Sequence, residues 1–424
     1  MTNRRLPAAL CVLATGALLA ACSNTATPPG SGTASAALRI ASNSSEKIAL
    51  DAAIAAFKQA NPGIDVQVTY ADTDPYLTTL RTQLSSGTAP DVFFAFPAKG
   101  NAGAVQVLAP SGYLQDLSAR SWAGQVPQDV KAVTQADGKQ YLLPVTFTGI
   151  GAIYNKKAMR EVGGSEPTTW ADVLDLCDKA KAAGKSAFAL GNQTPWVTQL
   201  IDYALVSTLV HTPGSTFDAD LAGGRTSFAA SAGWKGAMDK YLELNKRGCF
   251  SKDPLGTPVE TALQQVGKGE AVAAVQVLAT AGQIRDAAAQ GTELGMFPLP
   301  ATDDAEATRM PGAVGTSYAI NAKARNQAAA EKFIDFLAQP RAMNDYAAKS
   351  NAAPAIPNDA FTPDPAFSAL LDYQKSGRTV PFMDQFWPNP KVQQAHLSGV
   401  QELFSGAATP QDVLTEMDKA YKSN

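Results

Sequence analysis

The stretch LRIASNSSEKIALDAAIAAFKQANPGIDVQVTYADTDPYLTTLRTQLSSGTAPDVFFAF, residues 38–96, decides the fold because its hydrophobic residues follow two periods in turn. Leu50, Ile54 and Phe57 recur at helical spacing, whereas residues 64–70 alternate between apolar and polar as in a strand. A second helical pattern and an apolar run complete the stretch. Strands that alternate with helices predict an α/β fold built on a mostly parallel sheet.

Three loops of this pattern are expected to meet at one edge of the sheet, because ligands of parallel sheets bind beyond the carboxyl ends of the strands. These loops supply five candidate binding residues: Asn43, Ser44, Asp72, Phe96 and Lys99. For Asn43 an alternative role is equally supported. With Glu46 it has the spacing of a capping box, in which Asn caps the following helix.

The first 37 residues have the composition of an export segment. Two arginines and a short apolar run predict a signal peptide over 1–21, too short to span a bilayer. Its end, Leu19-Ala20-Ala21-Cys22, resembles the bacterial lipobox, which predicts lipidation of Cys22; an ordinary signal peptide is the alternative. Residues 22–37 carry the lipidated Cys22 and a polar, Gly- and Pro-containing stretch that predicts a flexible tether.

Composition excludes several classes of function. The 424 residues carry a formal net charge of −3 and show no basic patch for nucleic acid. The two histidines, His211 and His396, lack metal-ligand spacing, so we expect no metal, no cofactor and no Ser-His-Asp catalysis. Once Cys11 and Cys22 are set aside, Cys177 and Cys249 remain. Outside the cytoplasm they predict one disulfide, with two buried thiols as the alternative.

An ordered series of segments resembles one family. The segments include AAIAAFKQANPGIDVQVTY, LRTQLSSGTAPDVFFAF, QYLLPVTFTGIGAIYNKKAM, PTTWADVLDLC and AAAEKFIDFLAQP. In this order they are similar to the family-1, maltose-binding-like solute-binding proteins of ABC importers. The resemblance implies the periplasmic-binding-protein fold, two α/β lobes with a hinged cleft between them. We expect residues 38–145 plus 300–339 in lobe I and 146–299 plus 340–424 in lobe II.

The resemblance also implies further cleft residues. Trp196 follows a loop that looks like the family segment presenting an aromatic ring to the ligand, with core packing as the alternative. Trp387, in the Pro-flanked Gln385-Phe386-Trp387-Pro388, resembles a second cleft aromatic, a role that Phe386 could hold instead. The remaining candidates lie at expected strand ends and crossings: Thr148, Gln276, Gly315 and Thr316. A strand-end amide is the alternative for Gln276, and a plain turn for the glycine-rich loop.

Taken together, these features predict a substrate-binding protein rather than an enzyme. We expect a monomer, tethered by lipid to the extracytoplasmic face of the cell membrane. It would capture a mono- or oligosaccharide and deliver it to the subunits of an ABC permease. Two alternatives stay open: a binder of a glycerol-phosphate diester or other polar solute, using Lys99 or the loop from Gly312, and a lipid-anchored glycan hydrolase. Ser44-Ser45-Glu46-Lys47 matches Ser-x-x-Lys, but the partner motifs of penicillin-recognising enzymes are absent.

Overall fold

The computed structural model describes residues 37–423. The predicted signal peptide, the lipidation of Cys22 and nearly all of the tether lie outside these residues. Within them, no helix is long and apolar enough to cross a membrane. The described chain contains two main sheets, each with its own hydrophobic core cluster.

The first sheet has five strands in the order β2-β1-β3-β12-β6. They are β1 (Leu38–Asn43), β2 (Val66–Ala71), β3 (Val92–Phe94), β6 (Leu143–Pro144) and β12 (Ser317–Ile320). Strand β1 pairs in parallel with β2 and β3, whereas β12 pairs antiparallel with β3 and β6. The parallel pairing expected within residues 38–96 is therefore confirmed, but the prediction of a mostly parallel sheet is wrong, because β12 and β6 complete the sheet by antiparallel pairing.

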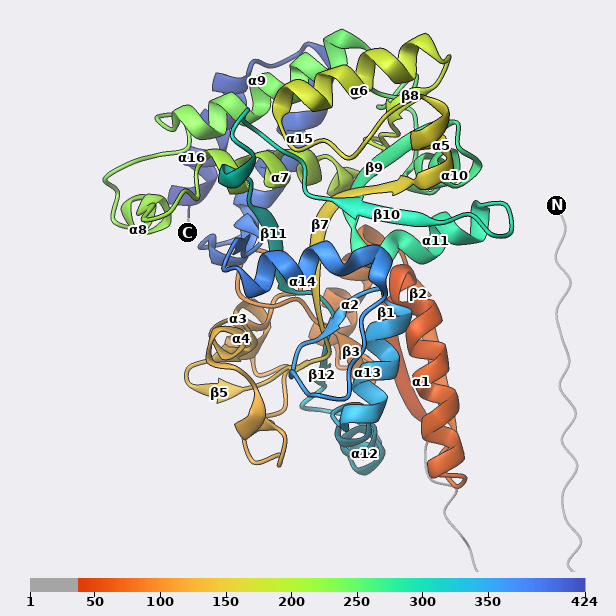
Figure 1. The fold of residues 1–424 in the computed structure, drawn as a ribbon. Helices are drawn as coiled ribbons and strands as arrows, with labels where there is room; N and C mark the ends of the chain where they lie inside the picture. The colour runs from red at the N-terminus through yellow and green to blue at the C-terminus, as the bar shows by residue number, and fades with distance from the viewer. Residues whose placement is uncertain (1–36, 424) are drawn as a thin grey trace, which may run out of the picture. The chain divides into compact units, whose positions relative to one another are not determined.

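Helices cover the first sheet through the apolar faces that their periodicity predicts. They are α1 (Lys47–Ala60), α2 (Thr73–Ser86), α3 (Val105–Leu108), α4 (Gln128–Thr134), α12 (Gln327–Leu337) and α13 (Pro340–Lys349). Helix α1 buries Leu50, Ile54 and Phe57 and packs beside α12 and α13 (Figure 1). A hairpin joins β4 (Gln135–Ala136) to β5 (Lys139–Gln140), and its turn residues Asp137 and Gly138 have φ of 50° and 74°. Positive φ at both positions is what Asp-Gly supplies in such turns.

The second sheet is built around one long strand, β7 (Thr146–Asn155), which is buried along its whole length. Its order is β14-β11-β7-β9-β8, and β10 and β13 also pair with β7. The other strands are β8 (Ser186–Phe188), β9 (Ala271–Val277), β10 (Leu294–Phe297), β11 (Met310–Val314), β13 (Ala353–Pro354) and β14 (Thr379–Val380). Strands β9, β10, β11 and β13 all run antiparallel to β7.

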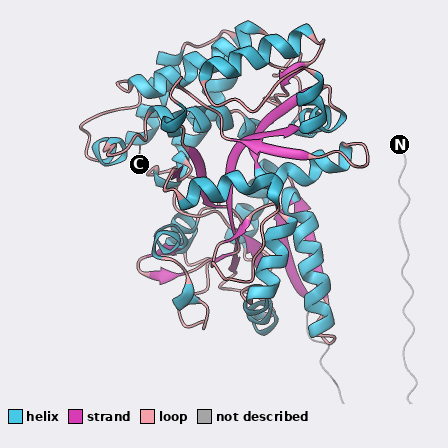
Figure 2. Cartoon of the chain, in the orientation of Figure 1, coloured by secondary structure: helices cyan, strands magenta, loops and turns pink. Residues whose placement is uncertain are grey.

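Helices also pack around the second sheet (Figure 2). They are α5 (Lys156–Glu161), α6 (Trp170–Ala182), α7 (Gln199–Leu209), α8 (Phe217–Ala222), α9 (Ala232–Arg247), α10 (Val259–Lys268), α11 (Ala281–Ala287), α14 (Ser368–Lys375), α15 (Pro390–Ser405) and α16 (Pro410–Lys422). The predicted disulfide is confirmed. Cys177 in α6 is bonded to Cys249, just after α9, with their Cα atoms 4.9 Å apart.

Three segments cross between the two sheets and are held together by backbone hydrogen bonds. The first crossing leads from Val145 into β7, the second passes through Gly315 and Thr316, and the third links α13 to β13. Val145 N donates to Thr316 O at 2.8 Å, and Ala355 N donates to Val145 O at 3.0 Å. All three crossings therefore meet at one place, which is where a hinge between the lobes would lie.

The core clusters divide the chain differently from the sequence-based boundaries. Strand β10 lies just before the lobe boundary expected at residue 300 and pairs with β7 in the second sheet, so the chain does not cross to lobe I there. Strand β11 also pairs with β7, whereas Met343 and Tyr346 of α13 belong to the core of the first sheet. We therefore propose lobe I as residues 38–145 plus 315–349, and lobe II as 146–314 plus 350–423. These definitions of the two lobes are used below.

Candidate functional site

A cavity of about 420 Å³ lies between the two sheets and is lined by residues of both lobes and of the crossings. Eight of the candidates from the sequence line it: Asn43, Ser44, Asp72, Phe96, Thr148, Trp196, Gly315 and Thr316. They come from chain positions more than 270 residues apart. The fold brings them together because the loops after β1, β2 and β3 open toward the same edge as the crossings.

Three other candidates lie outside the cavity. Lys99 is exposed, and its backbone N donates to Gln385 O at 3.4 Å. Gln276 is buried inside β9, where it lies opposite Gly151. The next residue, Val277, lines the cavity, and Gln276 does not. Trp387 is 3% exposed in the core of lobe II, packed against Phe228 and Trp234.

Asn43 does not cap the following helix. Its side chain makes no capping hydrogen bond to the turn Ser44–Glu46, and its Oδ1 is buried without a partner at the cavity wall. Asp72 occupies the N-cap position of α2, also without a capping hydrogen bond, and its side chain is exposed. Both side chains are therefore available to a ligand in the cavity.

Glu46 is a cavity residue that the sequence analysis assigned to helix capping. Its side chain points into lobe I, where Oε2 accepts hydrogen bonds from Thr316 Oγ1 at 2.7 Å and Tyr346 OH at 2.9 Å. The Tyr346 hydroxyl lies 2.9 Å from that of Tyr318, which is 3.0 Å from Ser42 Oγ. Burial raises the pKa of Glu46, and the hydrogen bonds from Thr316 and Tyr346 oppose that rise. This network ties the wall of lobe I to the second crossing.

The segment around Trp387 contributes to the cavity through residues other than the tryptophan. The short helix Met383–Phe386 turns Met383 and Trp387, four residues apart, into the core. Asp384 and Gln385 then line the cavity, together with Phe382 before them, while Phe386 is 50% exposed elsewhere. The helical spacing of Met383 and Trp387, four residues apart, is the sequence signal that separates these core residues from the cavity residues Phe382, Asp384 and Gln385.

Asp384 is the ionisable group of this segment. Its Oδ2 accepts from Gln393 Nε2 at 3.1 Å, and the same Nε2 lies 3.2 Å from Gln199 Oε1. Burial raises the pKa of Asp384 to about 6. The Gln393 amide is thus shared with a second acceptor, and the Tyr203 hydroxyl beside the carboxyl opposes the rise in the pKa of Asp384.

Helix α7 supplies part of the lobe II wall. Gln199 and Tyr203 line the cavity one turn apart, and the rest of the helix is buried almost all round. Tyr203 OH is buried beside the Asp384 carboxyl, and Thr148 Oγ1 on the neighbouring β7 is buried without a hydrogen-bond partner. Trp196 lies just before α7 in the short helix Pro195–Val197, partly exposed, with one side against the core of lobe II. Trp196 therefore packs against the core of lobe II and lines the cavity at the same time.

Two contacts join the rims of the cavity. On one rim, Gly100 of lobe I lies so close to the backbone of Asp384 that a Cβ at this position would overlap the Asp384 carbonyl. Next to it, Asn101 Nδ2 donates to Gln393 Oε1 at 3.4 Å. On the other rim, a Cβ added to Gly282 of α11 would lie 3.3 Å from Ile48 Cδ1 of α1. The lobes therefore touch on both sides of the cavity.

Two lobes with separate cores, three crossings and a cavity between them define a two-lobed ligand-binding protein. The chain belongs to the family described as bacterial extracellular solute-binding protein, whose model matches residues 43–344. The resemblance drawn from the sequence segments is thereby confirmed. The described residues contain no group of His, Cys, Asp or Glu that could hold a metal ion.

Similar proteins agree with this family. A protein named multiple sugar-binding protein from Streptococcus mutans is 26% identical over 298 residues, 68% of this chain and 68% of the relative. A structure from work on xylan utilisation by Caldanaerobius polysaccharolyticus has a TM-score of 0.78 at 18% identity, covering 90% of this chain and 99% of that one. A Bacillus licheniformis sugar transporter protein in complex with stachyose has a TM-score of 0.73 at 18% identity, covering 90% and 98%. At such identities the structures show the fold alone.

Proposed function

We propose that this protein is the extracytoplasmic receptor of an ABC importer and binds a mono- or oligosaccharide in the cavity between its lobes. The observation that carries the proposal is the lining of the cavity, where aromatic rings stand beside hydrogen-bonding side chains that lack partners. A cavity of about 420 Å³ is within the range of small-molecule sites. The names of the S. mutans and B. licheniformis proteins, which refer to sugars, support the same ligand class.

The chemistry of sugars matches this lining. A pyranose ring offers a weakly apolar face, which can pack on Trp196, Phe96 or Phe382, and a rim of hydroxyl groups. The hydroxyl groups can donate to Asn43 Oδ1 and Asp384, which have acceptor capacity left in the ligand-free structure. Satisfying a buried acceptor removes a desolvation cost, so such ligands gain affinity at these positions.

Binding of the sugar is coupled to closure of the lobes around the three crossings. A ligand shifts the protein toward the closed form only to the extent that it binds that form better. Gly100 of lobe I lies against the backbone of Asp384 in lobe II, so the rims are in contact in this structure. A ligand that bridges Asn43 and Asp384 therefore favours the closed form. The closed form then docks on the membrane permease and releases the sugar to it.

The proposed anchor is the lipid on Cys22, followed by the tether up to residue 37. A single short acyl chain gives only marginal anchoring, so a diacylglycerol-type modification is implied. Detergent-phase partitioning of the protein made in a bacterium tests this part of the proposal. The wild-type protein is expected in the detergent phase and the Cys22→Ser variant in the aqueous phase. Equal partitioning of the two would contradict lipidation.

The phosphodiester alternative has little support from the cavity. It required Lys99 or the glycine-rich loop as an anion site, but Lys99 lies outside the cavity. Residues Gly312–Val314 of that loop belong to strand β11, and the backbone N–H groups of Gly315 and Thr316, which line the cavity, already donate to Thr146 O and Oγ1. We therefore propose a saccharide carrier, active as a monomer, and assign no catalytic residue to it.

A thermal-shift screen tests the proposal, because a ligand that binds only the folded state raises its stability. The panel contains galactose, glucose, raffinose, stachyose, xylotriose and chitobiose, with glycerophosphocholine as the phosphodiester. At least one saccharide is expected to raise the melting temperature of the wild-type protein in a concentration-dependent manner. No shift with any saccharide would contradict the proposal.

The variant Trp196→Ala tests the site itself. Removing a buried aromatic contact of a ligand costs about 2 kcal/mol or more, so affinity for the best saccharide should fall at least about 30-fold. The matched control is Phe386→Ala, because Phe386 is an exposed aromatic residue outside the cavity. Calorimetry should show unchanged affinity for this control. Unchanged affinity in Trp196→Ala would remove Trp196 from the site.

A further inference from the structure

Among the described residues, the charged side chains that line the cavity are all carboxylates. Four carboxylates line it, Glu46, Asp72, Glu260 and Asp384, whereas no Lys, Arg or His among the described residues does so. None of the four carboxylates takes part in an ion pair within the part of the chain that the structure describes. A ligand entering this cavity meets negative charge without a compensating cation.

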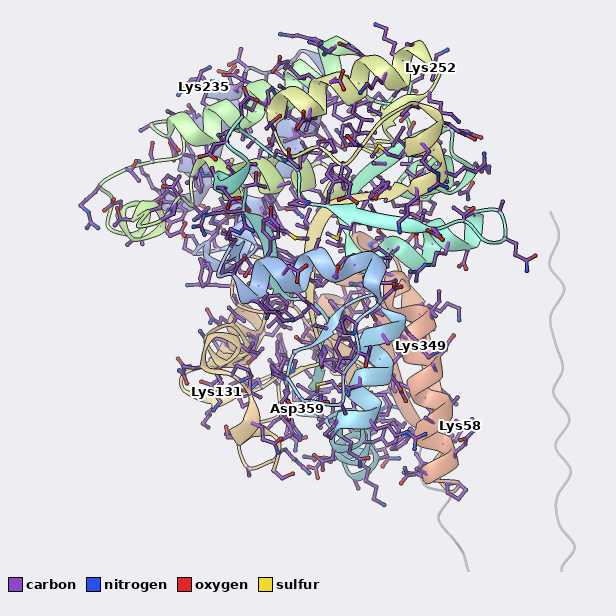
Figure 3. The ribbon with its side chains drawn as sticks, viewed as in Figure 1. Lys58, Lys131, Lys235, Lys252, Lys349 and Asp359 are labelled. Carbon is purple, nitrogen blue, oxygen red and sulfur yellow. A yellow bond between two sulfur atoms is a disulfide. The ribbon has the colours of Figure 1, made fainter. Side chains whose placement is uncertain are left out.

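The cationic side chains near the rims are directed elsewhere. Lys47, next to Glu46, pairs with Asp51 at 2.6 Å and lies over the ring of Tyr70. Arg285 of α11 donates to Asn351 and pairs with Asp364 at 2.6 Å. Other lysines, such as Lys131 and Lys349, point outward from the body (Figure 3). The sequence therefore provides cations, but the fold keeps them out of the cavity.

Two unpartnered acceptor atoms of the cavity favour the same preference, and the unpartnered hydroxyl of Thr148 can accept as well as donate. Asn43 Oδ1 and Gln385 Oε1 belong to side chains that are each 5% exposed, and both atoms lack a donor. Asp384 accepts from Gln393 and lies beside the Tyr203 hydroxyl, and no cationic side chain pairs with it among the described residues. These groups are acceptors, so they favour ligand groups that donate, such as hydroxyl or ammonium. A ligand carboxylate can offer none of these donors and would face Asp384 directly.

We propose that the cavity selects saccharides by charge: it accepts neutral sugars and rejects the same sugar skeleton bearing a carboxylate, and Asp384 is the main determinant of this rejection. This inference rests on the proposed function, because it concerns the ligand of the same cavity. Asp384 dominates because it is more buried than the exposed Asp72 and Glu260, so its field is less screened by water. Glu46 contributes less because its acceptor atom Oε2 is already engaged by Thr316 and Tyr346.

Charge at Asp384 is present under ordinary assay conditions. Its pKa, raised by burial to about 6, leaves the carboxyl ionised at pH 7.5. The titratable and charged groups around it are Tyr203 from α7, His396 from α15 and Lys99 beside the Gly100 contact. His396 is held by the buried Asp202 at 3.0 Å, and Lys99 is exposed, so neither supplies a cation to the cavity.

Matched sugar pairs test the inference by calorimetry at pH 7.5. The probes are galactose with galacturonate, glucose with glucuronate, and raffinose with raffinose oxidised to carboxylates at its primary hydroxyl groups. In the pair whose neutral member binds, the acidic member is expected to bind on the order of 100-fold more weakly, as like charges in a partly dehydrated site repel strongly. Equal or tighter binding of the acidic member would overturn the inference while leaving the saccharide function intact.

The variant Asp384→Asn keeps the size and one acceptor of the side chain but removes its charge. It should reduce the neutral-to-acidic affinity ratio at least about tenfold. The control Asp359→Asn changes an exposed carboxylate outside the cavity and should leave the ratio as in the wild type (Figure 3). A ratio unchanged by Asp384→Asn would remove Asp384 as the determinant. If that variant does not fold, Glu260→Gln at the exposed rim should still lower the ratio, and no change there would overturn the charge filter.

Failure of the underlying function gives a different result. If neither member of any pair binds, and no neutral saccharide of the wider panel binds, the saccharide function is contradicted and the inference falls with it. If neutral sugars bind and acidic ones bind equally well, only the charge filter is contradicted.

Discussion

The two walls of the cavity each present a buried carboxylate, yet the two groups have opposite surroundings. On lobe I, Glu46 accepts from the hydroxyls of Thr316 and Tyr346 and anchors a chain of hydroxyl groups behind the wall. On lobe II, Asp384 accepts from Gln393, whose amide also has Gln199 as an acceptor, and it lies beside the Tyr203 hydroxyl. Glu46 therefore holds its wall in place, whereas Asp384 stays available to a ligand.

The lobes also differ in how their cores are secured. Lobe II carries the Cys177–Cys249 disulfide, which closes a loop of 72 residues. Within the described residues, the wall of lobe I is held by hydrogen bonds and packing, with Phe57 against Phe333 as one example. Four predictions test these contrasts, from the largest expected effect to the smallest.

Loss of the disulfide should affect lobe II most. The chain-entropy model gives a stabilisation of about 4 kcal/mol for a loop of this length. The double variant Cys177→Ser with Cys249→Ser should therefore lose about that much free energy of unfolding, measured with urea. Hydrogen exchange should show the loss of protection in α6 and α9 and little change in α1. Equal loss of protection in both lobes would argue against separate cores.

Truncation of Glu46 should destabilise the protein. Glu46→Ala leaves the buried hydroxyls of Thr316 and Tyr346 without their acceptor, a cost of about 3 kcal/mol in the free energy of unfolding. The matched control is Glu293→Ala, whose side chain is 71% exposed and which should change stability by less than about 0.5 kcal/mol. Urea unfolding measures both, and similar effects of the two changes would break the contrast with Asp384.

Neutralising Asp384 should raise the free energy of unfolding, whereas truncating Glu46 should lower it. Its pKa in the folded protein is about 6 against an ordinary value of 3.8, so its ionisation opposes folding by at most about 3 kcal/mol. This penalty is absent below pH 3.8 and complete above pH 6. Asp384→Asn should therefore be more stable than the wild type by about 2 kcal/mol at pH 7.5. The difference should vanish as the pH falls below about 4, and a variant less stable at pH 7.5 would contradict the assignment.

The smallest effect concerns the contact between the rims. In Gly100→Ala, the added Cβ overlaps the Asp384 carbonyl, so the rims must separate. Affinity for the best saccharide should fall about tenfold, or about 1.4 kcal/mol. Solution scattering should show less compaction on ligand binding than in the wild type. Gly124→Ala, where a Cβ has nothing within 4 Å, is the control and should behave as wild type.

The sequence predicts the elements of lobe I well because they are periodic and end at clear signals. Leu50, Ile54 and Phe57 form the buried face of α1, and the alternating residues 64–70 fall largely in strand β2. The lobe boundaries were harder to predict. Extended residues at 295–300 have the same local pattern whether they cross between lobes or add a strand, and only pairing with β7 separates the two.

The cavity residues illustrate a second limit. The loops after β1 to β3 could be located because a parallel sheet brings its strand ends to one edge, and Asn43, Asp72 and Phe96 line the cavity. Residue type alone could not show that Trp387 is a core residue and Asp384 a cavity residue, because a Trp suits both a core and a sugar site. Glu46 has the spacing of a capping residue, but its carboxylate instead accepts hydrogen bonds from Thr316 and Tyr346, which lie 270 and 300 residues away in the sequence.

The most direct test of the central claim is a crystal structure of the protein with the neutral saccharide that binds most tightly in the panel. We expect a sugar ring between the lobes, with one face on Trp196 and hydroxyl groups within hydrogen-bonding distance of Asn43 and Asp384. A saccharide bound elsewhere on the surface, with the cavity between the lobes empty, would contradict a binding site between the lobes.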